Sequence, residues 1–288
     1  MSNFAIFIIT HERANNLLTL DTLKKCNYHG KIYLIIDNED KDMEIYKLYT
    51  NKQISLSIFN KKEIALRADT SLETKDNLSI SCCLFPRIYC ELFAKKLNLK
   101  NFLVLDDDIK NFYHRVNIDN KLKEIKINDF DLVCQEFCNY LNEANIAILG
   151  FGNTGSYLGG IHSFDTDCRR KCANAFFRNT NINFDWKCCV LEDVVSCIHN
   201  GSLGSIVLEL KCIKLEAFAY HNSKNNNNFG GMNNLYNKLS DYHALYSIIY
   251  NPIAFTIIQN KHNKFILRTE YNKILPKIIS SKYKRIEI

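Results

Sequence analysis

Three adjacent aspartates, Asp106, Asp107 and Asp108, follow the apolar segment 102–105 near the middle of this 288-residue chain. Like charges at this spacing repel one another, so the cluster needs a bound cation or a solvated loop. Mg²⁺ and Mn²⁺ prefer carboxylate oxygens and keep waters and substrate phosphates as further ligands. If the strand continues through the aspartates, Asp106 and Asp108 point to one side and Asp107 to the other. The triplet therefore predicts a metal–diphosphate site on Asp106 and Asp108, with a solvated strand end as the alternative.

A second acidic pair, Glu192-Asp193, precedes an amphipathic stretch at 194–198 that has helical character. Carboxylates at a helix start are stabilised in the ionised form by the helix dipole. An ionised carboxylate that faces a pocket can serve as a general base. The alternative interpretation is a simple charge at a helix N-terminus.

Basic side chains and histidines offer contacts for phosphate or metal. His11 and Arg13 follow the first predicted strand, and the planar guanidinium of Arg115 suits two phosphate oxygens. His221 and His262 are candidate metal ligands, although a lone histidine is more often a surface residue.

Apolar strands alternate with helical patterns in the first half of the chain. This order predicts an α/β fold with a mostly parallel sheet and helices on both faces. The predicted strands are 4–9, 31–36, 54–59 and 102–105, and the predicted helices are 17–25 and 85–97. Ligands bind at the carboxyl ends of such strands. The polar clusters 10–13, 37–40 and 106–108 should therefore meet at one sheet edge.

The pattern loosens beyond residue 125. We predict a helix over 129–142, a flexible hairpin or pocket wall in the glycine-bearing stretch 150–160, and a mobile loop at 222–231. The glycines lack the spacing of a dinucleotide loop. We expect one domain over 1–288, with a ligand-binding half over 1–125 and a second, looser half over 126–288.

Composition indicates a globular protein with a sizeable core, at 33.5 kDa and 47% hydrophobic residues. No apolar run reaches the roughly 18 residues of a membrane span, so a cytoplasmic location is expected. The twelve cysteines are scattered and are predicted to be reduced. Residues 261–288 carry eight Lys or Arg against two Glu, which accounts for the whole net charge of +6. That basic segment is either a solvated terminus or a surface for phosphate.

The ordered set of motifs resembles the TET-associated glycosyltransferases of phages and bacteria, which have a GT-A fold and are related to the base J glucosyltransferases. The resemblance covers nearly the whole chain, although Arg87 alone is shared at the helix start before the metal strand. It rests on the turn at 9–13, the segment 30–40, Phe102 to Asp108, the glycines of 150–160, Leu191 to Val194, and late positions such as Gly230-Gly231-Met232.

The resemblance implies that 1–125 is the nucleotide-sugar-binding half and that 126–288 is the acceptor-side half with the basic C-terminal segment. It also implies roles for particular residues. Asp193 or Glu192 would be the catalytic base, and Asp106, Asp108 and a late histidine, His221 or His262, would hold Mn²⁺ or Mg²⁺. A nucleotide-sugar donor similar to UDP-glucose would contact the residues Thr10, His11, Arg13, Asp37, Arg87, Asp106 and Asp107. The acceptor would contact Arg115, Gly159, Gly160, Gly230 and Gly231.

The implied activity is a hexosyltransferase that modifies a hydroxymethylated pyrimidine, such as 5-hydroxymethylcytosine, in DNA held by the basic C-terminal region. A transferase that acts on a surface polysaccharide would share the same donor half. An inactive nucleic-acid-binding derivative of the fold is the non-enzyme alternative.

Overall fold

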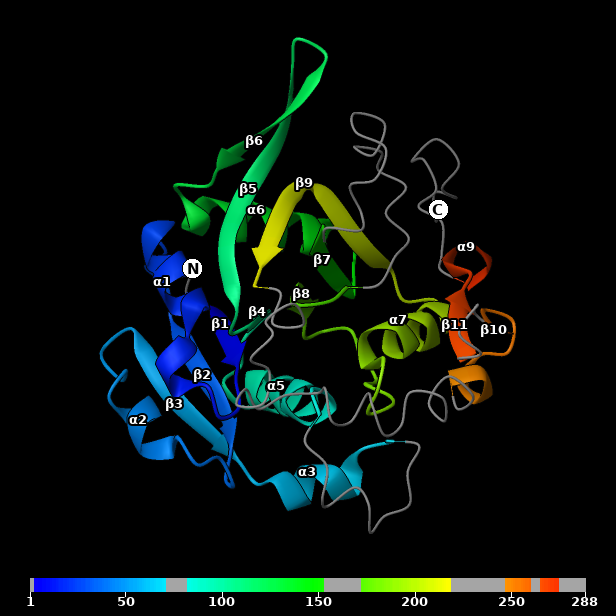
Figure 1. The fold of residues 1–288 in the computed structure, drawn as a ribbon, viewed down its shortest axis with the longest axis horizontal. Coiled ribbons are helices and arrows are strands. Elements are labelled where there is room, and N and C mark those ends of the chain that lie inside the picture. Colours follow the sequence, from blue (N-terminus) through cyan, green and yellow to red (C-terminus); the bar gives the residue numbers. More distant parts are fainter. Residues whose placement is uncertain (1–2, 71–81, 153–171, 219–246, 260–264, 275–288) are drawn as a thin grey trace, which may run out of the picture.

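The computed structural model describes residues 3–70, 82–152, 172–218, 247–259 and 265–274 (Figure 1). Its larger strands and helices, in chain order, are β1 (Phe4–Ile9), α1 (Leu18–Lys25), β2 (Ile32–Asp37), α2 (Met43–Lys47), β3 (Ile54–Phe59), α3 (Lys61–Arg67), α5 (Leu84–Lys96), β4 (Asn101–Asp106), β5 (Ile109–Ile118), β6 (Lys121–Lys126), α6 (Phe130–Glu143), β7 (Ile148–Gly152), β8 (Ala175–Asn179), α7 (Glu192–Ser202) and β9 (Val207–Ala217). A short 3-10 helix η1 (Ala14–Asn16), the hairpin β10 (Phe255–Gln259) and β11 (Phe265–Thr269), and α9 (Tyr271–Ile274) complete the described elements.

A nine-stranded sheet in the described residues has the order β3-β2-β1-β4-β8-β7-β9-β5-β6. The pairs among β3, β2, β1 and β4 are parallel, as the alternating pattern of the first half predicts. Beyond β4 the sheet is mixed: β8 pairs antiparallel with β4 and β7, while β7 and β9 are parallel. The α/β class is confirmed, but "mostly parallel" holds only for the first half.

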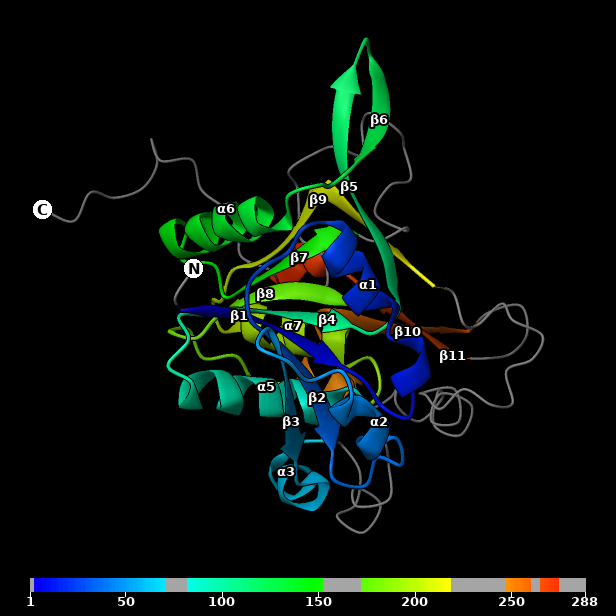
Figure 2. The ribbon, with the colours of Figure 1, turned by 90° about the vertical axis from the view of Figure 1, so that its left-hand side faces the viewer.

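Helices cover both faces of the sheet (Figure 2). The side chains of β1 alternate between the two cores: Ile6 and Ile8 face the core under α1 and α6, whereas Phe7 faces the core under α5 and α7. All three are fully buried, which is why the strand is a continuous apolar run. No helix among the described residues is long and apolar enough to cross a membrane. The described cysteines are free thiols and most are buried.

The stretch 150–160, predicted as a flexible hairpin or pocket wall, begins with the buried end of a strand. Gly150 and Gly152 lie in β7, and the remainder, 153–171, lies outside the described residues. A Cβ added at Gly150 would stand 2.9 Å from Cβ and Sγ of Cys172. Glycine is needed here for close packing between the strand and residue 172. The predicted loop at 222–231 also lies outside the described residues.

Candidate active site

The carboxyl ends of β1, β2 and β4 meet at one edge of the sheet. Ile9, the last residue of β1, is in register with Asp106 on one side and with Ile35 of β2 on the other. The polar clusters 10–13, 37–40 and 106–108 therefore lie together, as predicted from the parallel first half.

Asp106 and Asp108 each place one carboxylate oxygen, Oδ1, in the interior without a hydrogen-bond partner. Strand β4 ends at Asp106 and a turn follows, so the expected continuation of the strand through Asp108 is wrong. The turn is fixed from α1, because Thr19 Oγ1 donates to the Asp106 carbonyl at 2.6 Å and accepts from the Ile109 amide at 3.0 Å. Burial and the neighbouring aspartate raise the pKa of Asp106 well above its ordinary value, and burial and Asp107 raise that of Asp108 to about 6.

Two partly buried carboxylates, each with one buried and unpartnered oxygen, fit a divalent cation, since an added positive charge would offset both the desolvation and the mutual repulsion of the two negative charges. No group of three or more His, Cys, Asp or Glu that could hold a metal ion occurs within the described part of the chain. A Mg²⁺-type ion needs only one or two protein carboxylates when substrate phosphates and water complete its shell. The late histidines His221 and His262 lie outside the described residues.

Unlike its two neighbours, Asp107 bonds to the turn that follows β1. Its Oδ2 accepts from Thr10 Oγ1 at 2.7 Å, and its Oδ1 lies 3.0 Å from Nη1 of Arg13. Tyr46 from α2 completes the group: its hydroxyl accepts from the Arg13 amide and hydrogen-bonds Thr10 Oγ1, both at 3.0 Å. The turn after β1 is thereby locked to the metal motif. Nothing in the local sequence of Tyr46 signals this role, because the contact spans 36 residues.

His11 pairs with the acidic end of β2. Its Nδ1 lies 3.0 Å from Asp37 Oδ2 and 3.5 Å from Asp40 Oδ2. The bond to Asp37 raises the pKa of His11 despite its partial burial. Burial alone would raise the pKa of Asp37, but His11 and the Glu39 amide lower it on balance. This pair lies at the edge of the sheet where we predicted that the donor nucleoside binds.

Arg87 is buried on α5 and forms an ion pair with Glu192, with 2.8 Å between Nη1 and Oε1. Its guanidinium lies 5.4 Å and 5.2 Å from the ring centroids of Phe176 and Trp186. Burial would lower its pKa, but the charges of Glu192, Asp106 and Asp193, among others, raise it. Arg87 is thus an internal counter-ion between the metal motif and the second acidic pair, and its predicted donor contact stays a prediction.

The second acidic pair begins α7, as predicted. Glu192 and Asp193 are both buried. The preceding Leu191 has left-handed backbone angles, φ 57° and ψ 31°, a conformation that costs a leucine roughly 1 kcal/mol or more. This turn directs the start of α7 toward Arg87.

Of the predicted acceptor contacts, Arg115 alone lies within the described residues. Arg115 is buried in β5, 3% exposed. Gly159, Gly160, Gly230 and Gly231 lie outside the described residues. Of the basic C-terminal segment, Arg268 is exposed on β11 and Lys273 pairs with Glu270 at 2.6 Å.

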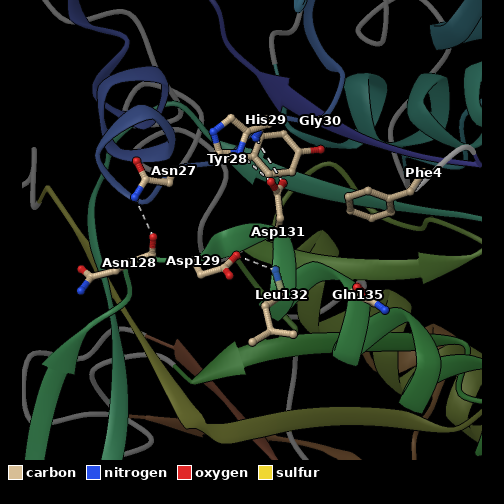
Figure 3. Close-up of a pocket in the computed structure, with 10 residues that line it drawn as sticks. All are labelled: Phe4, Asn27, Tyr28, His29, Gly30, Asn128, Asp129, Asp131, Leu132 and Gln135. Carbon is tan, nitrogen blue, oxygen red and sulfur yellow. Dashed lines mark hydrogen bonds and ion pairs between the residues drawn. The ribbon is translucent and has the colours of Figure 1, made fainter.

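A cavity of about 660 Å³ lies at the opposite, amino ends of β1 and β2 (Figure 3). It is lined by Phe4, the turn at 27–30 and the start of α6. His29 Nδ1 lies 2.8 Å from Asp131 Oδ2 there, and Asn27 donates to the Asn128 carbonyl. The aspartate triplet and the acidic pair on α7 are not among its lining residues, so it is separate from the candidate active site.

Residues 4–231 match the TET-Associated Glycosyltransferase family. The chain belongs to that family and is a nucleotide-sugar glycosyltransferase. A search of curated proteins found no match.

Two solved structures resemble the fold. The first is assigned as a nucleotide-diphospho-sugar transferase from Desulfovibrio desulfuricans G20; it is 12% identical, with a TM-score of 0.42 over 87% of this chain and 99% of that one. The second is GalNAc-T7 with UDP, GalNAc and Mn²⁺; it is 10% identical, with a TM-score of 0.46 over 75% of this chain and 44% of that one. At this level of similarity neither structure says what this chain binds.

Proposed function

We propose that the protein uses a divalent metal to transfer a sugar from a nucleotide-sugar donor to the hydroxyl of a hydroxymethylated pyrimidine in DNA. The observation that supports a bound metal is the pair of buried, unpartnered oxygens on Asp106 and Asp108 at the carboxyl end of β4. The acceptor rests on membership of the TET-associated family, for which the sequence resemblance implies modified DNA bases.

Asp106 and Asp108 would hold the metal, whose chemistry when bound is to neutralise the charge of the leaving diphosphate, worth several kcal/mol. The edge formed by Thr10, His11 and Asp37 is the wall along which the donor nucleoside would lie. Arg13, which forms an ion pair with Asp107 in the metal motif, supplies positive charge beside the aspartates and would face the phosphates.

Asp193 is the better candidate for the base, because Glu192 is committed to Arg87. The acceptor hydroxyl oxygen bonds to the anomeric carbon of the sugar while the bond from that carbon to the diphosphate breaks. The hydroxyl proton passes to the carboxylate of Asp193 at the start of α7. Glu192 and Arg87 would fix the position of that helix start.

The test offers the protein UDP-glucose with Mn²⁺ and a matched set of acceptors: DNA that contains 5-hydroxymethylcytosine, the same DNA with cytosine, and a bacterial polysaccharide. Mass spectrometry should find a hexose on the hydroxymethylated DNA alone. Transfer only to the polysaccharide would overturn the proposed acceptor. Calorimetry that detects neither Mn²⁺ nor nucleotide-sugar binding, across several sugar donors, would favour an inactive nucleic-acid-binding derivative.

A further inference from the structure

Strands β5 and β6 form a two-stranded ribbon that extends beyond the body of the protein (Figures 1 and 2). The two-stranded ribbon comprises Tyr113 to Ile118 of β5 and Lys121 to Lys126 of β6, and the first residue of β5, Ile109, directly follows Asp108. Its turn, Asp119 and Asn120, has φ of 53° and 56°, the left-handed angles of a tight hairpin whose twist matches that of the strands. The ribbon is therefore a defined arm on the strand that leads away from the candidate metal site.

One face of this arm carries basic and aliphatic side chains. Residues that are directly opposite in an antiparallel pair project to the same side. The register therefore defines a ribbon face made of His114 with Ile125, Val116 with Lys123, and Ile118 with Lys121. Ile118 and Ile125 are 37% and 48% exposed, and both lysines are exposed.

The acidic side chain of the strands projects to the other face and is neutralised there. Glu124 is opposite Arg115 in the register, and its Oε2 lies 2.8 Å from Nζ of Lys214 on β9. The six side chains of the ribbon face are consequently two lysines, one histidine and three aliphatic residues, with no acidic side chain. Exposed isoleucines beside lysines on an arm are not needed to build the core of the sheet.

We propose that the ribbon face docks duplex DNA next to the active site, an inference that rests on the proposed function and names the surface that holds its acceptor. Lysine charge matches the phosphate backbone. A two-stranded ribbon fits the major groove, which is about 12 Å wide, where aliphatic side chains contact thymine methyl groups. A second copy of this chain is a poorer occupant, since Lys121 and Lys123 at the β6 edge would face like charges.

The arm also sets a distance. The ribbon-face residues of β5, His114 to Ile118, lie beyond Asp108 by about 20–33 Å at roughly 3.3 Å per residue. One turn of duplex DNA is about 34 Å long. The ribbon face would therefore contact the duplex within about one turn of the base that enters the active site.

The test compares the wild type with Lys121→Ala/Lys123→Ala in binding to an unmodified duplex of about three turns, by fluorescence anisotropy over a salt series. Two lost phosphate contacts should lower the slope of log affinity against log salt by about 2 and weaken binding by about tenfold or more. The matched control is Lys95→Ala/Lys96→Ala, two adjacent exposed lysines at the end of α5, which should bind as the wild type does.

Wild-type affinity and slope in the ribbon variant would overturn the inference, and so would a change in oligomeric state by sedimentation, which would assign the face to a second copy. The acceptor is tested separately, on a hydroxymethylated oligonucleotide too short to reach the ribbon. The ribbon variant should glycosylate that oligonucleotide as the wild type does. If the wild type binds duplex DNA through the ribbon but glycosylates no DNA, the proposed function fails and the ribbon inference stands.

Discussion

Arg87 and Glu192, 105 positions apart in the chain, form a buried ion pair that joins α5 to the start of α7. Both side chains are less than 7% exposed, and the guanidinium lies beside the rings of Phe176 and Trp186. The pair connects the helix before the metal strand to the acidic motif that begins α7. It explains why a buried arginine stands at a site that otherwise gathers carboxylates.

Removing either partner should be costly, because the other charge would be left buried. Arg87→Met is expected to lower the free energy of unfolding by about 3–5 kcal/mol in urea denaturation. The double variant Arg87→Met/Glu192→Gln should lose less than the sum of the two single variants. Lys47→Met, which breaks the exposed pair with Glu44, is the control and should change stability by less than about 1 kcal/mol. Additive effects in the double variant would contradict the pairing.

We expect Asp106 and Asp108 each to lower the stability of the metal-free protein and to contribute to metal binding. Asp108→Asn removes a buried charge whose oxygen has no partner, so the metal-free protein should be stabilised by about 1 kcal/mol or more. Adding Mn²⁺ should raise the melting temperature of the wild type and leave that of the variant unchanged. Asp119→Asn, in the exposed ribbon turn, should retain the response to Mn²⁺. An undiminished response in Asp108→Asn would rule out this residue as a ligand.

The His11–Asp37 pair should make stability depend on pH. The raised pKa of His11 means that its contribution is complete below the unfolded pKa near 6.5 and is lost as pH rises through the folded value. The lowered pKa of Asp37 places its contribution above its unfolded pKa, to be lost as pH falls through the folded value. Denaturation across this range should show the alkaline loss in the wild type and not in His11→Gln, with an amplitude of up to about 1 kcal/mol. His29→Gln is the control, since the side chain of His29 is 78% exposed.

Gly150 should not accept even one methyl group. An added Cβ would meet Cys172 at 2.9 Å, so Gly150→Ala is expected to cost about 1–3 kcal/mol in thermal or chemical unfolding. Gly204→Ala is a comparison with a different cause: nothing lies within 4 Å of its added Cβ, but its φ of 94° strains any other residue. Only the Gly150 variant should be partly rescued by Cys172→Gly, which vacates the space.

Much of the active-site edge followed from sequence because the first half of the chain is a regular βα alternation. Parallel strands bring their carboxyl ends to one edge, so the polar residues after 9, 36 and 105 had to converge once the strands were recognised. The strands β5, β6, β8 and β9 were not recognised. Strands β5, β6 and β9 lie at the far side of the mixed sheet and are partly exposed, so their periodicity is weaker, whereas β8 is a buried run of only five residues, which periodicity alone does not distinguish from a helix segment.

The sequence by itself determined the class of fold, the family and the position of the acidic motifs, because strand periodicity and residue type are local properties. Only the tertiary structure decided which carboxylates have partners. Asp107 bonds to Thr10 and Arg13, and Glu192 forms an ion pair with Arg87. Asp106 and Asp108, in contrast, each have one carboxylate oxygen without a hydrogen-bond partner. The partners of these carboxylates lie 90 to 105 positions away in the chain, and a local sequence pattern contains no information on contacts between residues so far apart.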